Sequence, residues 1–353
     1  MKYILPIALL AFIQWQGNAQ SCLPGGITFV TQADVDNFPI NHPTCKVIEG
    51  NVYALSSSIQ NLNGLSQIEH IGGDLLISGN EQLANLNGLA KLKTIGLACR
   101  IQNNPLLTNL DSLRRLSAVK GDFFYIGNNI ALASIEGLAE LDSISGIFHL
   151  WGNTPLTSLK GLGQLQRLGD RLAVFNNANL SKLEGLDSLT YVGQDLRFED
   201  NPLLSDISSL NHPITVKGAL AIIGNSTLSN CAVESVCDYL AMPATFVAIS
   251  GNGPNCQSVQ EVETACLSSV WSMTDIQQTL RISPNPTTGL VRFLTEDTAF
   301  EIIRVMDITG RICDVDLKQN MTLDLSSVDP GIYWVEIGNQ YGRAMTKVVK
   351  ILK

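Results

Sequence analysis

The most regular feature of the sequence is an asparagine that returns about every 24 residues, in register with leucine and isoleucine positions. The spacings are 24, 25, 24, 24, 24, 24 and 27 residues, and the column consists of Asn80, Asn104, Asn129, Asn153, Asn177, Asn201, Asn225 and Asn252. Each unit reads L-x-I-x-x-N-x-x-L-x-x-L-x-G-L-x-x-L-x-x-I-G. Such a unit cannot bury its apolar face alone and must stack on copies of itself. The pattern therefore predicts a mainly β protein built around a parallel β-solenoid.

The residues that precede each asparagine alternate between two kinds of column. Three and five positions before it, the side chains are apolar in every coil, and Cys99 takes one of these places. Two and four positions before it, charged, aromatic and small residues are mixed. Because side chains of a strand point alternately to its two faces, the uniform columns are expected to face the core and the mixed columns to face solvent. Cys99 is then a buried free thiol.

The asparagine column itself is expected to be structural. At the end of a strand, an inward asparagine can bridge the backbone of neighbouring coils and satisfy buried N–H and C=O groups. A row of ligand-binding asparagines is the alternative.

The mixed columns bring aromatic residues onto three adjacent coils. Neighbouring strands of a sheet lie about 4.8 Å apart, so these rings are expected to form one patch. Exposed aromatic clusters rimmed by charges are typical of binding surfaces. We therefore expect a ligand face made of Arg100, Tyr125, His149, Trp151, Phe175, Arg197, Glu199 and Ile223. Coverage of this patch by a loop, by the linker or by a second protomer is the alternative.

The N-terminus has the parts of an export signal. Lys2 supplies a positive charge, an apolar run follows, and Ala19 ends a small-residue cleavage site, so residues 1–19 are predicted to be a signal peptide. The apolar run is too short for a spanning helix, and no later segment reaches about 20 apolar residues. We therefore expect no transmembrane segment.

The eight cysteines are unevenly placed, and an exported chain favours disulfides. We expect Cys22 and Cys45 to be paired. Three pairings are possible for the cysteines near the end of the repeats, which are Cys231, Cys237, Cys256 and Cys266. A zinc site is the rival interpretation of these four, although the cluster has no C-x-x-C and no nearby histidine.

The repeat frame, with cysteine clusters at both ends, resembles the leucine-rich-repeat superfamily and, within it, receptor L-domain-like solenoids. The resemblance covers about residues 22–267, and we take residues 20–267 as a solenoid with cysteine-containing caps. It implies short parallel strands, one prominent sheet and little helix. It leaves the ligand open, because such solenoids serve many partners.

The remainder of the chain differs in kind. After a polar linker at residues 268–280, short alternating strands and Pro, Gly and Asp turns predict a small antiparallel β-sandwich over residues 281–353. Its motifs closely resemble the C-terminal sorting domain of type IX secretion substrates in Gram-negative bacteria, and the matching residues are Pro284, Asn285, Pro286, Gly289, Asp307, Gly310, Arg311, Pro330, Gly331, Tyr333, Lys350 and Lys353. The resemblance implies contact with the type IX machinery, passage through the outer membrane, and release or attachment at the cell surface. An ordinary accessory sandwich domain is the alternative.

Composition narrows the function further. The chain is globular in composition, with 45% hydrophobic and 16% charged residues, and its net charge of −9 without a Lys/Arg cluster argues against nucleic-acid partners. None of the four histidines lies in H-E-x-x-H, and neither a G-x-S-x-G elbow nor a Walker loop occurs. We therefore expect no catalytic, cofactor or metal site, and no enzyme.

Together these features predict an exported, adhesin-like or receptor-like protein, either secreted or held at the cell surface. The outward face of its solenoid is expected to bind a protein or a glycan. A structural envelope scaffold without a dedicated ligand is the alternative, and an unrecognised enzymatic activity is a third interpretation. A concentrated aromatic patch favours binding, whereas a uniformly polar face would favour scaffolding.

Overall fold

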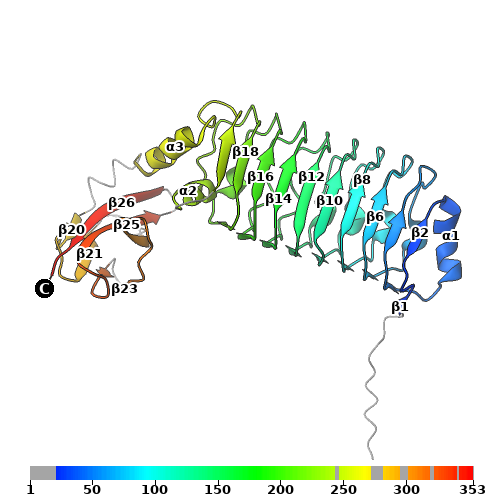
Figure 1. The fold of residues 1–353 in the computed structure, drawn as a ribbon, viewed down its shortest axis with the longest axis horizontal. Helices are drawn as coiled ribbons and strands as arrows, with labels where there is room; N and C mark the ends of the chain where they lie inside the picture. Colours follow the sequence, from blue (N-terminus) through cyan, green and yellow to red (C-terminus); the bar gives the residue numbers. More distant parts are fainter. Residues whose placement is uncertain are drawn as a thin grey trace, which may run out of the picture.

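The computed structural model describes residues 21–242, 246–271, 281–294, 301–318, 322–339 and 342–352. The predicted signal peptide at residues 1–19, residues 272–280 of the predicted linker, and Lys353 of the sorting motif lie outside these ranges. Figure 1 shows a long row of stacked coils followed by a smaller β structure at the C-terminal end. The predicted mainly β solenoid is confirmed by two long parallel sheets.

The larger sheet has ten strands, one from each coil, and all pairs within it are parallel (Figure 1). Each strand is short because the chain must turn away after the asparagine to begin the next side of the coil. In chain order, the strands are β2 (Ile27–Phe29), β4 (Val52–Ala54), β6 (Leu75–Ser78), β8 (Cys99–Gln102), β10 (Phe123–Gly127), β12 (Ile147–Trp151), β14 (Leu172–Phe175), β16 (Leu196–Glu199), β18 (Leu220–Ile223) and β19 (Val247–Ser250).

A second parallel sheet of nine two-residue strands follows the other side of the coils. The ten-stranded sheet is the one prominent sheet that is expected from the sequence. The second parallel sheet is not expected from the sequence. Its strands are β1 (Ser21–Cys22), β3 (Val47–Ile48), β5 (His70–Ile71), β7 (Thr94–Ile95), β9 (Ala118–Val119), β11 (Ser143–Ile144), β13 (Arg167–Leu168), β15 (Tyr191–Val192) and β17 (Thr215–Val216). Single 3-10 turns lie in several coils, namely η1 (Asn63–Leu65), η2 (Asn87–Leu89), η3 (Asp111–Leu113), η4 (Glu136–Leu138) and η5 (Ser208–Leu210).

The inward columns form one continuous core along the solenoid, as the alternation predicts. Phe124 and Phe148 occupy equivalent places on adjacent strands, both are 0% exposed, and their ring centroids are 5.1 Å apart. Cys99 is likewise buried and free, and burial raises the pKa of its thiol far above the usual range. Each coil thus removes the apolar surface of its neighbours from water, which is the main stabilising term for such an array.

The asparagines form a buried ladder between coils, which confirms their structural role. The backbone N–H of Asn153 donates to Oδ1 of Asn177 at 3.1 Å, and the Asn153 Nδ2 donates to the carbonyl of Ile126 at 3.1 Å. The same pair of contacts recurs from coil to coil, and these asparagine side chains are almost fully buried. The incomplete first coil joins through the N–H of Ser56, which donates to Asn80. Backbone groups that would otherwise be buried without partners are satisfied in this way.

The residue just before each ladder asparagine has a left-handed backbone. The φ angles are positive at all eight of these positions, which are Gly79, Asn103, Asn128, Gly152, Asn176, Asp200, Gly224 and Gly251. Glycine, asparagine and aspartate tolerate this region of backbone space better than other residues. The column contains only these three residue types, because the backbone is left-handed there in every coil.

Helices lie at both ends of the solenoid (Figure 1), and disulfides bond the chain at each end. At the N-terminal end, α1 (Gln32–Asn41) begins with a capping box between Thr31 and Asp34, and Cys22 is bonded to Cys45, the expected pairing. At the other end lie α2 (Glu234–Leu240) and α3 (Val259–Trp271). Of the three possible pairings there, the structure contains Cys231–Cys256 and Cys237–Cys266. Terminal coils expose a core edge and need such caps.

The start of the predicted linker at residues 268–280 is helical. Residues 268–271 belong to α3, which continues to Trp271. The sequence has no proline or glycine between Val259 and Trp271 that would end the helix sooner.

The C-terminal region folds into two small antiparallel sheets with a core of their own. An ion pair joins this region to the C-terminal cap of the solenoid, where Arg304 lies between Asp238 of α2 and Glu336. The first sheet contains β20 (Arg281–Ser283), β21 (Leu290–Leu294), β23 (Asp316–Lys318) and β24 (Thr322–Asp324). The second contains β22 (Glu301–Asp307), β25 (Gly331–Asn339) and β26 (Gly342–Lys350).

Candidate functional site

The outward face of the ten-stranded sheet carries a group of aromatic side chains on β10, β12 and β14. In β12, Phe148 and Leu150 are 0% exposed, whereas His149 and Trp151 are only partly buried. The strand register pairs Tyr125 with His149 and Trp151 with Phe175. The four aromatic residues expected to form one patch therefore lie side by side.

These rings contact one another in a defined order. The rings of Tyr125 and His149 are stacked, with centroids 4.9 Å apart and planes 13° apart. His149 meets Phe175 edge to face at 5.8 Å, and Trp151 lies parallel to Phe175 at 6.2 Å. The ring centroids of Phe123 and Tyr125 are 5.3 Å apart, so Phe123 extends the group. We call these five residues the aromatic strip: Phe123, Tyr125, His149, Trp151 and Phe175.

A glycine makes room for the largest ring of the strip. Gly127 stands directly opposite Trp151 on the neighbouring strand. A Cβ atom on Gly127 would lie 2.1 Å from Cε2 and 2.2 Å from Nε1 of Trp151. The indole therefore occupies the space into which any other side chain at position 127 would project. Trp151 is held against the backbone of β10 on one side and beside Phe175 on the other.

Charged groups border the strip at both ends. The guanidinium of Arg100 lies 5.5 Å from the ring centroid of Phe123 and 5.9 Å from that of Tyr125, within reach of cation–π attraction. At the opposite end, Arg171 and Arg197 both pair with Asp195, at 2.7 Å and 3.1 Å.

Asp195 is the carboxylate that both of these arginines share. Burial opposes its ionisation, but the hydrogen bond from the N–H of Ala219 and the charges of Arg171 and Arg197 outweigh burial and lower its pKa. The carboxylate therefore stays ionised and neutralises part of the positive charge at this end of the strip.

His149 is the titratable ring within the strip. Its burial, and secondly the positive charge of Arg171, lower its pKa below the usual value. Its Nε2 atom is shielded and has no hydrogen-bond partner among the described residues. The ring is therefore neutral at pH 7 and acts as one more apolar aromatic surface beside Tyr125.

The remaining residues of the expected ligand face lie farther along the sheet. Arg197 and Glu199 form an ion pair on β16 at 3.4 Å, and Ile223 lies opposite Glu199 on β18. Sequence reasoning missed Phe123, Arg171 and Asp195, which occupy a third outward column two positions before that of Tyr125. Extending the strand alternation by one step would have found them.

No group of three or more His, Cys, Asp or Glu side chains that could hold a metal ion occurs in the part of the chain that the structure describes. Over the same ranges, no helix is both long and apolar enough to cross a membrane.

The sorting-motif residues hold turns and strand ends in the C-terminal region. Asn285 bridges to β26, since its Nδ2 donates to the Lys347 carbonyl and its Oδ1 accepts from the N–H of Val349. The carboxylate of Asp307 accepts hydrogen bonds from Thr309, which lower its pKa, and it also accepts from the N–H of Arg311.

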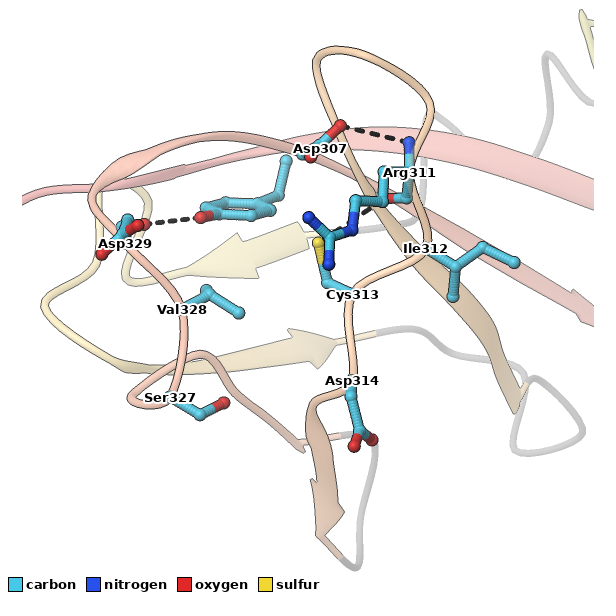
Figure 2. Close-up of a pocket in the computed structure, with 9 residues that line it drawn as sticks. Asp307, Arg311, Ile312, Cys313, Asp314, Ser327, Val328 and Asp329 are labelled. Atoms are coloured by element: carbon cyan, nitrogen blue, oxygen red, sulfur yellow. Dashed lines mark hydrogen bonds between the residues drawn. The ribbon is translucent and has the colours of Figure 1, made fainter. Parts of the chain in front are cut away.

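Figure 2 shows the pocket around these turns, where Asp307, Arg311, Cys313 and Asp329 surround one space. The hydroxyl of Tyr333 donates to the Asp329 carbonyl, and the Lys350 ammonium donates to the carbonyls of Ser326 and Val328. These residues therefore stabilise the fold of the region around its turns.

Comparisons with known proteins match two separate parts of the chain. Residues 44–132 match the family model of the receptor L domain, and residues 281–351 match that of the secretion system C-terminal sorting domain. The first match ends before His149 and Trp151, so most of the aromatic strip lies on later coils. No curated protein matches the chain. One part of the solenoid is thus similar to the receptor L domain and the C-terminal region is similar to the secretion system C-terminal sorting domain, which supports a secreted or cell-surface protein.

Proposed function

We propose that this protein binds a partner outside the cell through its aromatic strip and that it has no catalytic role. The observation that carries the proposal is the gathering of five rings on three adjacent strands of a solvent-facing sheet. Aromatic residues of this kind dominate the energetics of many interfaces, because they bury a large area with few rotatable bonds. The partner is a protein or a glycan of the extracellular surroundings.

The export route is part of this proposal. We infer that the chain follows the type IX pathway and is exposed beyond the outer membrane of a Gram-negative bacterium. The support is the sorting-domain match over residues 281–351, together with the motif residues that hold its turns. A binding protein needs such exposure to meet its partner.

A scaffold without a ligand would not need this concentration of rings. In the column that contains Trp151 and Phe175, other coils carry Ser78, Gln102 and Ser250, which are small or polar. The solenoid continues through those coils with the same core and the same ladder. Stacking alone therefore does not require the rings, which favours binding over scaffolding.

The direct test is removal of Trp151 from the exported protein, followed by a screen on arrays of glycans and matrix proteins. We expect Trp151→Ala to weaken binding by roughly thirtyfold or more, as for a central aromatic contact. The melting temperature should change little, because the side chain lies outside the core.

The matched control is Tyr191→Ala. Tyr191 is a partly buried ring on the second sheet, where Arg167 lies 4.2 Å from its centroid. This variant should bind as the parent does. Equal binding by the parent and by Trp151→Ala, or unfolding of that variant, would contradict the proposal.

A further inference from the structure

We infer that the partner is an acidic glycan, whose sugar rings stack on the aromatic strip and whose carboxylate pairs with Arg100. This inference rests on the proposed function, since it names the chemistry of the partner that the same strip would bind. Three features carry it: an unpaired cation at one end of the strip, a sheet without a free edge beneath the rings, and a row of amides beside Trp151.

The unpaired cation is Arg100. Of the three arginines that border the strip, Arg171 and Arg197 form ion pairs with Asp195, whereas Arg100 makes no ion pair among the described residues. Its guanidinium lies over the rings of Phe123 and Tyr125. A planar guanidinium that lies beside rings without a carboxylate is suited to receive one from a ligand.

The sheet beneath the rings disfavours an extended peptide. Peptides often bind a sheet by adding a strand to a free edge. Here β10 and β12 are central, and each is paired on both sides. A ligand must therefore be recognised through the side chains of the sheet face. Aromatic faces carry partial negative charge, and the C–H faces of sugar rings present partial positive charge to them.

The strip is also prearranged as a platform. Trp151 is positioned by the absence of a side chain at Gly127, and Tyr125 is stacked on His149. Rings that already contact one another lose little conformational freedom on binding, which favours affinity. An open row of rings of this kind fits several successive sugar units.

Amide groups lie beside the indole. Gln102 stands opposite Gly127 in the strand register, and the exposed side chains of Asn103 and Asn128 follow these two residues, joined by a 2.7 Å hydrogen bond. Each amide has both donors and an acceptor, so this row can pair with the hydroxyl groups of a sugar. The strip thus presents stacking, hydroxyl recognition and a cation within one surface.

The negative net charge of the chain means that a preference for acidic sugars depends on Arg100. Because the chain carries a net charge of −9, it does not attract an acidic ligand over long distances. Preference for an acidic over a neutral sugar must then come from a local contact. Arg100 is the cation on the strip that can supply it.

The experiment uses the exported protein and three acidic glycans, each beside a neutral counterpart. These are oligogalacturonate and its methyl ester, hyaluronan and its carboxyl-reduced form, and a sialylated oligosaccharide with its desialylated form. We expect at least one acidic form to bind more tightly than its counterpart. Arg100→Gln should weaken binding of the acidic form about 10- to 100-fold, the range for a charged hydrogen bond, and leave the neutral form unchanged.

Controls separate charge, folding and surface effects. Arg167→Gln removes the guanidinium that lies over Tyr191 on the second sheet and should not alter binding. Arg100→Lys keeps the charge and should retain part of the preference. Melting temperatures of all variants should match that of the parent.

The outcomes distinguish this inference from the proposed function. Binding of poly-glutamate or of a protein that depends on Trp151, without binding of any acidic glycan, overturns the glycan inference and leaves the proposed function intact. Equal affinity for acidic and neutral forms, or an unchanged preference in Arg100→Gln, also overturns it. Absence of any binding that depends on Trp151 overturns both.

Discussion

The inward and outward faces of the ten-stranded sheet use the same strands under different constraints. Inward positions contain the same kind of residue in every coil, and Phe124, Leu150 and Val174 are all 0% exposed. Outward positions vary freely, so that Gly127, Trp151 and Glu199 share one column. Each inward side chain must fit the coils on both sides. The outward side chains do not have to fit between neighbouring coils. An unusual group of residues on the outward face therefore points to function.

The comparison predicts that an inward change alters stability and that an outward change alters binding. The largest expected effect comes from Asn153→Ala in the ladder. This change leaves the buried N–H of Asn129 without its acceptor and removes one donor from the carbonyl of Ile126. A buried group without a partner costs about 1–3 kcal/mol, so we expect the free energy of unfolding, measured in urea, to fall by about 1–3 kcal/mol.

The control for this prediction is the neighbouring Asn128→Gly. Asn128 is exposed and has a φ of 52°, a conformation that glycine adopts without strain. We expect a change within about 0.5 kcal/mol, as for most surface substitutions. If Asn153→Ala is no more destabilising than Asn128→Gly, the asparagine ladder does not stabilise the stacked coils.

The same contrast explains how much of the fold could be predicted. Stacking imposes the 24-residue period on the sequence, so the coils, the inward columns and the ladder follow from it directly. The neighbours on the outward face follow as well, because parallel strands in register bring Tyr125 beside His149. The 24-residue period places each coil beside the next one, and it therefore also determines which outward residues are neighbours.

Features without a period could not be predicted in the same way. The second sheet consists of two-residue strands such as His70–Ile71, which are too short to show alternation. The pairing of Cys231 with Cys256 depends on how the cap folds, which spacing alone does not determine. The role of Gly127 in seating Trp151 appears only once the indole is positioned. The fold of the C-terminal cap and the position of Trp151 in the aromatic strip therefore depend on contacts that are not repeated from coil to coil.

A smaller effect on stability is expected for a change on the outward face. In Gly127→Ala, the new Cβ meets the indole of Trp151 and must displace it. Overpacking of this kind costs about 1 kcal/mol or somewhat more. We expect binding to weaken, though less than in Trp151→Ala, and the tryptophan fluorescence spectrum to shift.

Ser78→Ala is the matched control, because Ser78 occupies the same column on β6 away from the rings. It should leave both binding and fluorescence as in the parent. Unchanged fluorescence and binding in Gly127→Ala would show that the position of Trp151 does not depend on the glycine.

The smallest expected effect concerns the pH dependence of stability, and it tests whether the outward face is as free of structural constraint as the comparison implies. Burial and the charge of Arg171 lower the pKa of His149 below its ordinary value of 6.5. As the pH falls through 6.5, the unfolded chain therefore takes up a proton at this position before the folded chain does. Proton uptake by the unfolded state destabilises the fold, so this contribution to stability decreases as the pH is lowered.

His149→Phe removes the titrating group and keeps an aromatic ring beside Tyr125. Comparing the variant with the parent at each pH cancels the pH dependence of groups elsewhere in the chain, so the difference reports the imidazole together with the influence of Asp170 and Arg197 on it. We expect the free energy of unfolding of His149→Phe, relative to the parent, to be higher at pH 5.5 than at pH 7.5. If that difference is the same at both pH values, the imidazole is as solvated in the fold as in the unfolded chain. The strip would then be looser than its ring contacts indicate, and its use as a rigid platform for a ligand would have to be abandoned.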